Sequence, residues 1–137
     1  MDSVDLISRS NIQKRDYGYG YSNIDQVADM SKTSFSNGTL TYNGDLYISR
    51  ADLSSCNLVV DGQLEASSLK VKNLTVGNEN ATYGLKLADP KMEISGNVVA
   101  TGKTAGIKIG DLHAGSDVHL NITGNVTATG GEYGYYQ

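Results

Sequence analysis

The stretch from Leu58 to Val76 reads LVVDGQLEASSLKVKNLTV, and its pattern decides the fold. Apolar residues alternate with polar ones in short pairs, and this alternation predicts β-strands of only a few residues. The apolar positions recur every five or six residues, at Leu58 and Val60, Leu64, Leu69 and Val71, and Leu74 and Val76. Between them lie residue types that turn a chain at low cost, namely Asp61-Gly62, Ser67-Ser68 and Lys72-Asn73. A chain that turns so often can coil into a β-solenoid.

The composition supports a thin, all-β body. The 137 residues include sixteen glycines, one proline, one phenylalanine and no tryptophan, so small aliphatic side chains must supply the core. The expected fold is a short-strand β-solenoid or a trimeric β-prism, with an extended N-terminal arm and one short helix. A compact β-sandwich or barrel is the alternative, because short strands with turn signals also build those folds.

Residues 1–36 differ from the rest and are expected to form an N-terminal anchoring arm. A short helix is predicted over about residues 23–31, because Ser22 or Asn23 can cap it and its apolar residues share one stripe. So short a helix must pack on the body or on another molecule. The candidate partner-binding residues of the arm are basic, aromatic or apolar: Arg9, Lys14, Arg15, Tyr17, Tyr19, Tyr21, Ile24, Val27 and Met30.

Residues 37–137 are expected to form the β-body, with a Tyr-rich C-terminal tail. Two Asn-Gly pairs, Asn37-Gly38 and Asn43-Gly44, predict hairpins or corners at its start. The alternation breaks at residues 77–84, which predicts a surface loop, and Asp89-Pro90 predicts a further turn. The body is therefore expected to turn often and to hold only short strands.

An internal repeat stands out in the last third of the chain. Residues 92–102 align with residues 120–130 at an offset of 28, and both copies contain GNVxATG. A repeat at fixed spacing predicts one structural unit used twice, as in stacked coils. After the repeat come Tyr133, Tyr135 and Tyr136, whose rings suit an interface, a glycan contact or the closing of a solenoid end.

The sequence carries no motif of a known catalytic or cofactor site, and we expect no enzymatic activity, cofactor or metal. His113 and His119 lie near Asp111 and Asp117, but their spacing matches no common metal motif. The single cysteine, Cys56, is expected to be a small buried or half-buried residue rather than a nucleophile. A net charge of −4 argues against general attraction to nucleic acid or anionic membranes.

Two resemblances follow from these patterns. The segment NLVVDGQLEASSLKVKNLTV, within about residues 38–76, resembles the β-solenoid repeats of bactofilins, bacterial cytoskeletal proteins that polymerise end to end. The whole chain, with its arm, its Gly-, Asn- and Thr-rich body and its aromatic tail, looks like small virion proteins of tailed phages. That class includes head-decoration, head-fibre and short tail-fibre proteins.

The virion resemblance implies a non-enzymatic structural protein, anchored to a capsid or tail surface by its arm and projecting an oligomeric β-body. Its expected partners are a major capsid or tail protein and further copies of the chain, with a trimer favoured because a thin coil buries little apolar area. Such a protein is made in the host cytoplasm and ends in the virion. The alternatives are a bactofilin-like, self-polymerising scaffold in the bacterial cytoplasm and a carbohydrate- or receptor-binding fibre tip.

Overall fold

The computed structural model describes residues 3–5, 11–14, 26–29, 38–110 and 119–136, and within them all regular structure is β-strand. The strands join in one twelve-stranded sheet whose pairs are nearly all parallel. They are β1 (Ser3–Asp5), β2 (Asn11–Lys14), β3 (Gln26–Asp29), β4 (Thr39–Asn43), β5 (Leu46–Asp61), β6 (Leu64–Gly77), β7 (Tyr83–Ile94), β8 (Val98–Gly102), β9 (Ala105–Gly110), β10 (His119–Ile122), β11 (Val126–Gly130) and β12 (Tyr133–Tyr136). The all-β prediction is confirmed.

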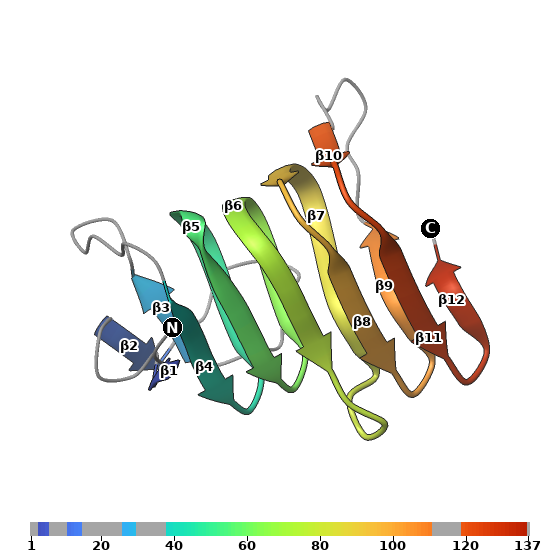
Figure 1. The fold of residues 1–137 in the computed structure, drawn as a ribbon. Helices are drawn as coiled ribbons and strands as arrows, with labels where there is room; N and C mark the ends of the chain where they lie inside the picture. Colours follow the sequence, from blue (N-terminus) through green and yellow to red (C-terminus); the bar gives the residue numbers. More distant parts are fainter. Residues whose placement is uncertain (1–2, 6–10, 15–25, 30–37, 111–118, 137) are drawn as a thin grey trace.

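The sheet coils into a solenoid, because each turn of the chain pairs with the turn before it. Between β5 and β6, Leu46 lies beside Leu64, Leu53 beside Val71 and Leu58 beside Leu74. The register shifts between Leu53 and Asn57, where β5 bends from one wall to the next. Figure 1 shows these strands rising at the back, curling over and descending at the front. The short alternations predicted in Leu58–Val76 are thus segments of long, bent strands.

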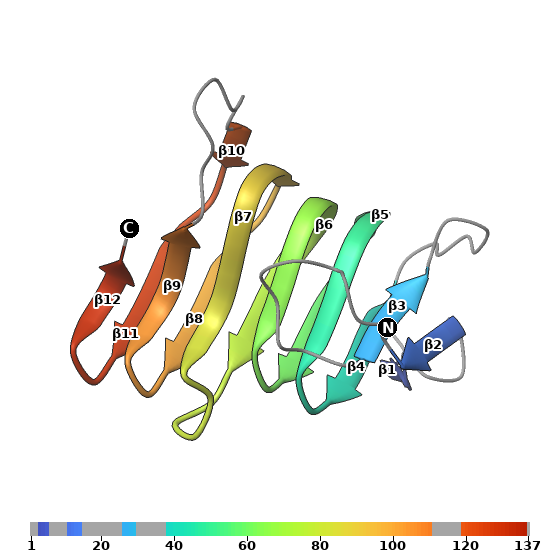
Figure 2. The ribbon, with the colours of Figure 1, turned by 180° about the vertical axis from the view of Figure 1, so that it is seen from behind.

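Three stacks of parallel segments form the walls of the coil, and the views from the two sides agree on their order (Figures 1 and 2). The first stack runs through β3, the starts of β5, β6 and β7, then β9 and β12. The second runs through the middle of β5, the middle of β6, the end of β7 and β10. The third runs through β1, β4, the ends of β5 and β6, then β8 and β11.

The core lies inside the coil because alternate side chains of a strand point to opposite faces. In the third stack, Leu40, Leu58, Leu74 and Val98 lie in register on successive strands, and each is at most 2% exposed. Leu46, Leu64 and Leu85 do the same in the first stack, and Leu69 and Met92 in the second. The core therefore closes within one chain, so the burial of these side chains does not depend on a trimer.

The 28-residue repeat is confirmed as one structural unit used twice. Val126 lies beside Val98, Leu120 beside Met92 and Tyr133 beside Ala105, each pair 28 positions apart. Earlier turns are shorter, since Leu64 lies 18 positions after its neighbour Leu46. Coil length thus varies, from 16 positions between Leu58 and Leu74 to 28 in the last coil, while the alternation of inward and outward residues is kept.

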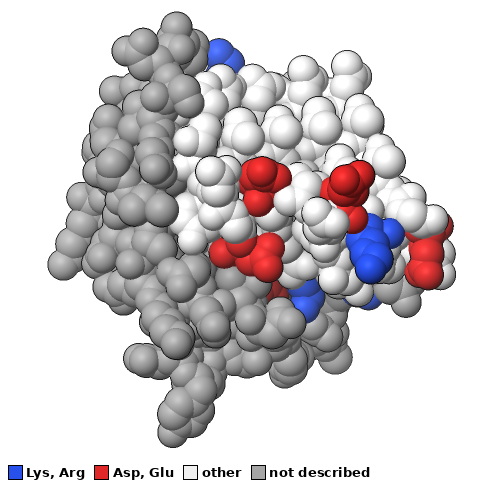
Figure 3. Space-filling view, turned by 90° about the horizontal axis from the view of Figure 1, so that it is seen from below, with Lys and Arg blue, Asp and Glu red and all other residues white. Residues whose placement is uncertain are grey.

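Tight turns join the third stack to the first along one edge. Gly44, in the turn between β4 and β5, has a φ of +119°. Residues 78–82 form the predicted loop, where Asn78 Oδ1 accepts hydrogen bonds from the N–H groups of Asn80 and Ala81. The exposed charged residues of this edge are Asp45, Asp61, Glu79, Lys103 and Glu132. Figure 3 looks onto this edge and shows the charges gathered there beside a wide uncharged area.

An asparagine ladder stiffens the corner where the chain enters the third stack. Asn73 Nδ2 donates to Asn57 Oδ1 at 2.8 Å, and the backbone N–H of Asn97 donates to Asn73 Oδ1 at 2.7 Å. The backbone N–H of Asn125 then donates to Asn97 Oδ1 at 2.9 Å. Below them, Asn57 Nδ2 donates to Thr39 Oγ1 at 3.3 Å. We call Asn57, Asn73, Asn97 and Asn125 the asparagine ladder.

Replacing Asn73 tests this ladder. Asn73→Ala removes both the donor to Asn57 and the acceptor of the Asn97 N–H, so we expect the free energy of unfolding to fall by roughly 1–3 kcal/mol. Asn125→Ala is the matched control, because its own N–H still donates to Asn97 and only a side chain at the end of the ladder is lost. Urea titration followed by circular dichroism compares the two, and equal losses would contradict the ladder's role.

Three sequence-based expectations need correction. The helix over residues 23–31 is wrong at its centre, because Gln26–Asp29 is strand β3, which pairs with β2 and β5. Asp89-Pro90 is not a turn between strands: it lies inside β7, at an irregularity where Leu87 and Lys91 pair with Ala66 and Ser68. Tyr133–Tyr136 is no tail but strand β12 of the solenoid. Strand pairing overrides local propensity at all three places.

The described parts of the predicted arm also join the sheet. β1 pairs in parallel with β4, and β3 pairs in parallel with β5. β2 pairs only with β3, in antiparallel orientation. These three strands therefore lie at the N-terminal end of the solenoid, opposite the end formed by β10, β11 and β12 (Figure 1).

Candidate assembly surface

The C-terminal coil, which we define as β10, β11 and β12, exposes positions that are buried one coil earlier. Val98 is 0% exposed, whereas Val126, its neighbour in the same column, is 48% exposed. Ile107 is 3% exposed, whereas its neighbour Tyr135 is 50% exposed. Of the four large apolar side chains exposed in the described residues, Val126, Tyr133 and Tyr135 belong to this coil. Its apolar surface is the continuation of the core.

The same coil presents strand edges. In the described part of the chain, β10 pairs only with β7, β11 only with β8 and β12 only with β9. Each therefore offers one edge of backbone N–H and C=O groups to a further strand. Edges of this kind recognise an added strand through main-chain hydrogen bonds, while inward side chains set the specificity.

The coil is almost free of charge. Between Leu120 and Tyr136 the only charged residue is Glu132, which lies at the turn before β12. The chain as a whole carries a net charge of −4, so most of its charge lies elsewhere. An uncharged end with exposed apolar side chains can contact another protein without burying an unpaired ion.

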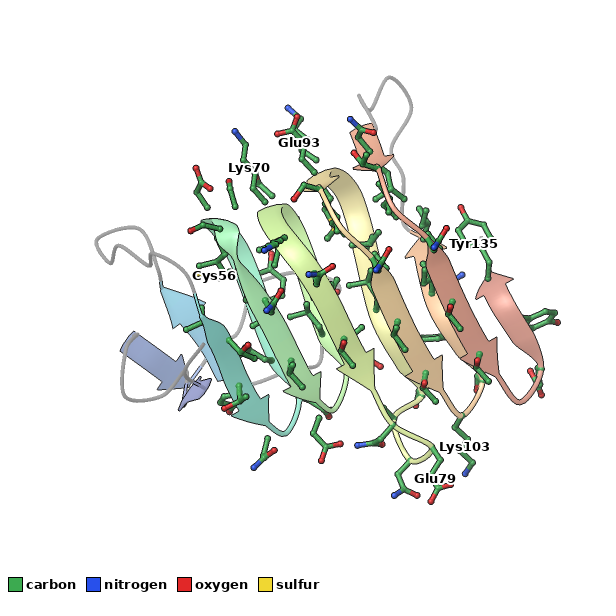
Figure 4. All side chains as sticks on the ribbon, viewed as in Figure 1. Cys56, Lys70, Glu79, Glu93, Lys103 and Tyr135 are labelled. Atoms are coloured by element: carbon green, nitrogen blue, oxygen red, sulfur yellow. The ribbon has the colours of Figure 1, made fainter. Side chains whose placement is uncertain are left out.

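A shallow groove lies across the second stack, where β5, β6, β7 and β10 bend towards the third. It encloses about 210 Å³ and is lined by Ser54, Lys70, Val71, Glu93, Ile94, Ser95, Asn121 and Thr123. Lys70 Nζ and Glu93 Oε2 lie 3.6 Å apart, and both side chains are half exposed. Figure 4 shows the two side chains projecting from neighbouring strands, far from Tyr135. An exposed ion pair of this kind contributes little to stability.

The neighbouring carboxylate, Asp52, is held in its charged form. Hydrogen bonds from the side chain and backbone of Ser54 lower the pKa of Asp52, and the nearby charge of Lys70 adds to this. Asp52 is exposed, so the lowered pKa reflects local hydrogen bonding at a corner rather than a buried reactive group. It makes Asp52 less suited to donate a proton near neutral pH.

A second hollow, of about 390 Å³, lies among the turns of the charged edge. Its carboxylates already serve the turns: Asp45 Oδ1 accepts the N–H of Gln63, and Asp61 Oδ1 accepts Asn78 Nδ2. Among the residues that the structure describes, no three His, Cys, Asp or Glu side chains come together as a metal site would need. Asp45 and Asp61 thus act as structural groups of the turns.

Only some of the residues predicted to bind a partner or a glycan lie in the part of the chain that the structure describes. Tyr133 and Tyr135 are exposed on the C-terminal coil, and Tyr136 follows in β12. Lys14 belongs to β2 and Val27 to β3. The other candidates of the arm lie outside the described residues: Arg9, Arg15, Tyr17, Tyr19, Tyr21, Ile24 and Met30. His113, Asp111 and Asp117 lie outside them as well, and His119 begins β10.

Two residues of the surface were missed from the sequence. Both Val126 and Asn125 belong to the repeated GNVxATG, but neither was predicted to take part in a contact between chains. The repeat could have indicated both residues, because its offset of 28 aligns Val126 with Val98 and Asn125 with Asn97. Val98 is buried, and Asn97 accepts the N–H of Asn125. Cys56, in contrast, is buried as predicted.

No helix long and apolar enough to cross a membrane occurs in the described ranges. Comparison of the chain with protein-family models, curated proteins and solved structures finds no match.

Proposed function

We propose that the protein is a non-enzymatic structural scaffold, in which copies of the chain associate through the C-terminal coil. The observation that carries the proposal is the exposure of Val126 and Tyr135 at positions whose neighbours one coil earlier are almost fully buried. A second chain placed against this end restores the burial of the core.

Features beside the end support a scaffold over an enzyme. The charged groups of the two hollows are engaged: Asp45 and Asp61 in the turns, and Lys70 with Glu93 in an exposed ion pair. A solenoid transmits its regular strand spacing from coil to coil, which suits it as a rigid rod or spacer. In such a protein, function depends on which surfaces meet and in what order.

Whether such a scaffold forms a bacterial filament or part of a virion depends on what else it binds. The bactofilin-like alternative needs only further copies of the chain. A virion protein also needs a capsid or tail surface, to which residues 1–36 are expected to attach. The two settings share the C-terminal coil as a contact between copies.

Sedimentation of the purified chain from low to high micromolar concentration tests the proposal. We expect the average mass to rise with concentration, because the contact is an end surface of modest area. Val126→Lys places a charge in the centre of the surface and is expected to leave the chain monomeric. A wild-type chain that stays monomeric would overturn the proposal. A trimer independent of concentration and of Val126→Lys would favour the closed trimer instead.

A further inference from the structure

We infer that the partner of the C-terminal coil is the N-terminal end of a second copy, with β11 of one chain in parallel beside β1 of the next. The inference rests on the proposed function and adds the orientation of the contact. It predicts a polar, head-to-tail assembly. A contact between two C-terminal coils would instead give a closed, two-fold dimer.

One column of residues runs through the third stack from end to end. Val4 lies beside Leu40, and register then leads through Leu58, Leu74 and Val98 to Val126. The column therefore has a valine at both ends, in strands that run in the same direction. When the end of one copy meets the start of the next, Val126 lies beside Val4 and the spacing of the column continues.

The asparagine ladder gives the contact its direction. Each upper member accepts a backbone N–H from the next coil with its side-chain oxygen: Asn73 from Asn97, and Asn97 from Asn125. At the C-terminal coil, Asn125 Oδ1 is the next acceptor of this series. The residue that continues the ladder at the other end is Ser3, which lies beside Thr39, itself beside Asn57. The N–H of Ser3 in a second copy is therefore the donor that this series calls for.

The edges at the two ends favour this pairing in the third stack. β1 pairs with β4 on one side, and no other described strand pairs with it. β11 likewise has β8 as its only described strand partner. The first stack differs, because its outermost described strand at this end, β2, runs antiparallel to β3. The inferred contact thus runs through the third stack, where both end strands point in the same direction.

Complementation between two blocked variants tests the orientation. Val126→Lys blocks the C-terminal end, and Val4→Lys blocks the N-terminal end at the other terminus of the same column. Each variant alone is expected to sediment as a monomer. An equimolar mixture is expected to form a heterodimer of twice the monomer mass, because each variant keeps one intact end. Thr127→Lys is the matched control, since it adds the same charge on β11 at an exposed, outward position and is expected to associate like the wild type.

The alternatives give different results. If Val4→Lys alone still forms dimers and the mixture gains no mass, the chains meet through two C-terminal coils and the inference fails, while the proposed function stands. If the wild type is monomeric, the proposed function fails first. Ser3→Pro is the second block of the N-terminal end, because it removes the N–H that the inferred contact needs. It must complement Val126→Lys as Val4→Lys does, and a failure of both to complement overturns the inference. Circular dichroism and thermal unfolding establish that each variant is folded.

Discussion

Leu74→Ala is expected to lower the free energy of unfolding by about 2–5 kcal/mol, the usual cost of truncating a fully buried leucine. Leu74 is 0% exposed and lies in the third-stack column between Leu58 and Val98. Coils above and below hold its neighbours in place through paired backbones, so the cavity cannot easily collapse. Because a solenoid is stabilised by contacts between neighbouring coils, a defect in the middle weakens the contacts on both sides.

Val126→Ala is the matched control, since it shortens an apolar residue of the same column at the open end. Val126 is 48% exposed, so only about half of it is removed from water in the isolated chain. We expect its loss to stay below about 1 kcal/mol. Urea unfolding at low protein concentration, where the chain is monomeric, compares the two. Similar losses of unfolding free energy for both variants would mean that Val126 is as well packed as Leu74. That result would contradict the argument that the C-terminal coil is an open end of the core.

The sequence indicated the parts of this fold that depend on local patterns. Alternation in Leu58–Val76 placed the inward residues, and the repeat at residues 92–102 and 120–130 indicated the stacking. A loop was expected over residues 77–84, and residues 78–82 form it. The inward residues could be predicted because inward and outward positions must alternate along every strand of the coil. The burial of Cys56 was expected from its place in the segment DLSSCNLVV.

Other features depend on the pairing of strands in neighbouring coils, so the local sequence pattern could not predict them. The strands β5, β6 and β7 bend without a break, so Lys72-Asn73 and Asp89-Pro90 resemble turns in sequence yet lie within strands. The residues around Val27 have a helical pattern, but their pairing with Tyr47 and Ile48 makes them a strand. Coil length varies from 16 to 28 positions, so only the last two coils show a repeat. The open end appears only when exposure is compared along a column.

Gly77→Ala is expected to cause a loss as large as that of Leu74→Ala, by a different mechanism. Gly77 ends β6 with a φ of +87°, in the left-handed region that costs other residues roughly 1–2 kcal/mol. A Cβ atom there would lie 1.8 Å from the carbonyl oxygen of Thr101 and 2.5 Å from Gly84 Cα. Both obstacles are backbone atoms of the next coil, so they can move only if the strand pairing of β6 with β8 opens locally. We expect a total loss of at least about 3 kcal/mol, or failure to fold.

Gly44→Ala separates the two contributions. Gly44 also has a positive φ, +119°, but the nearest atom to an added Cβ is Tyr42 Cε2 at 3.5 Å, an ordinary contact. Its variant therefore carries the strain of the left-handed backbone without the collision, and we expect a loss of roughly 1–2 kcal/mol. Thermal unfolding of the two variants measures the difference, which is the cost of forcing neighbouring coils apart. If Gly77→Ala lost no more than Gly44→Ala, the close approach of β6 and β8 would be wrong, and so would the tight coil spacing on which the inferred contact between chains depends.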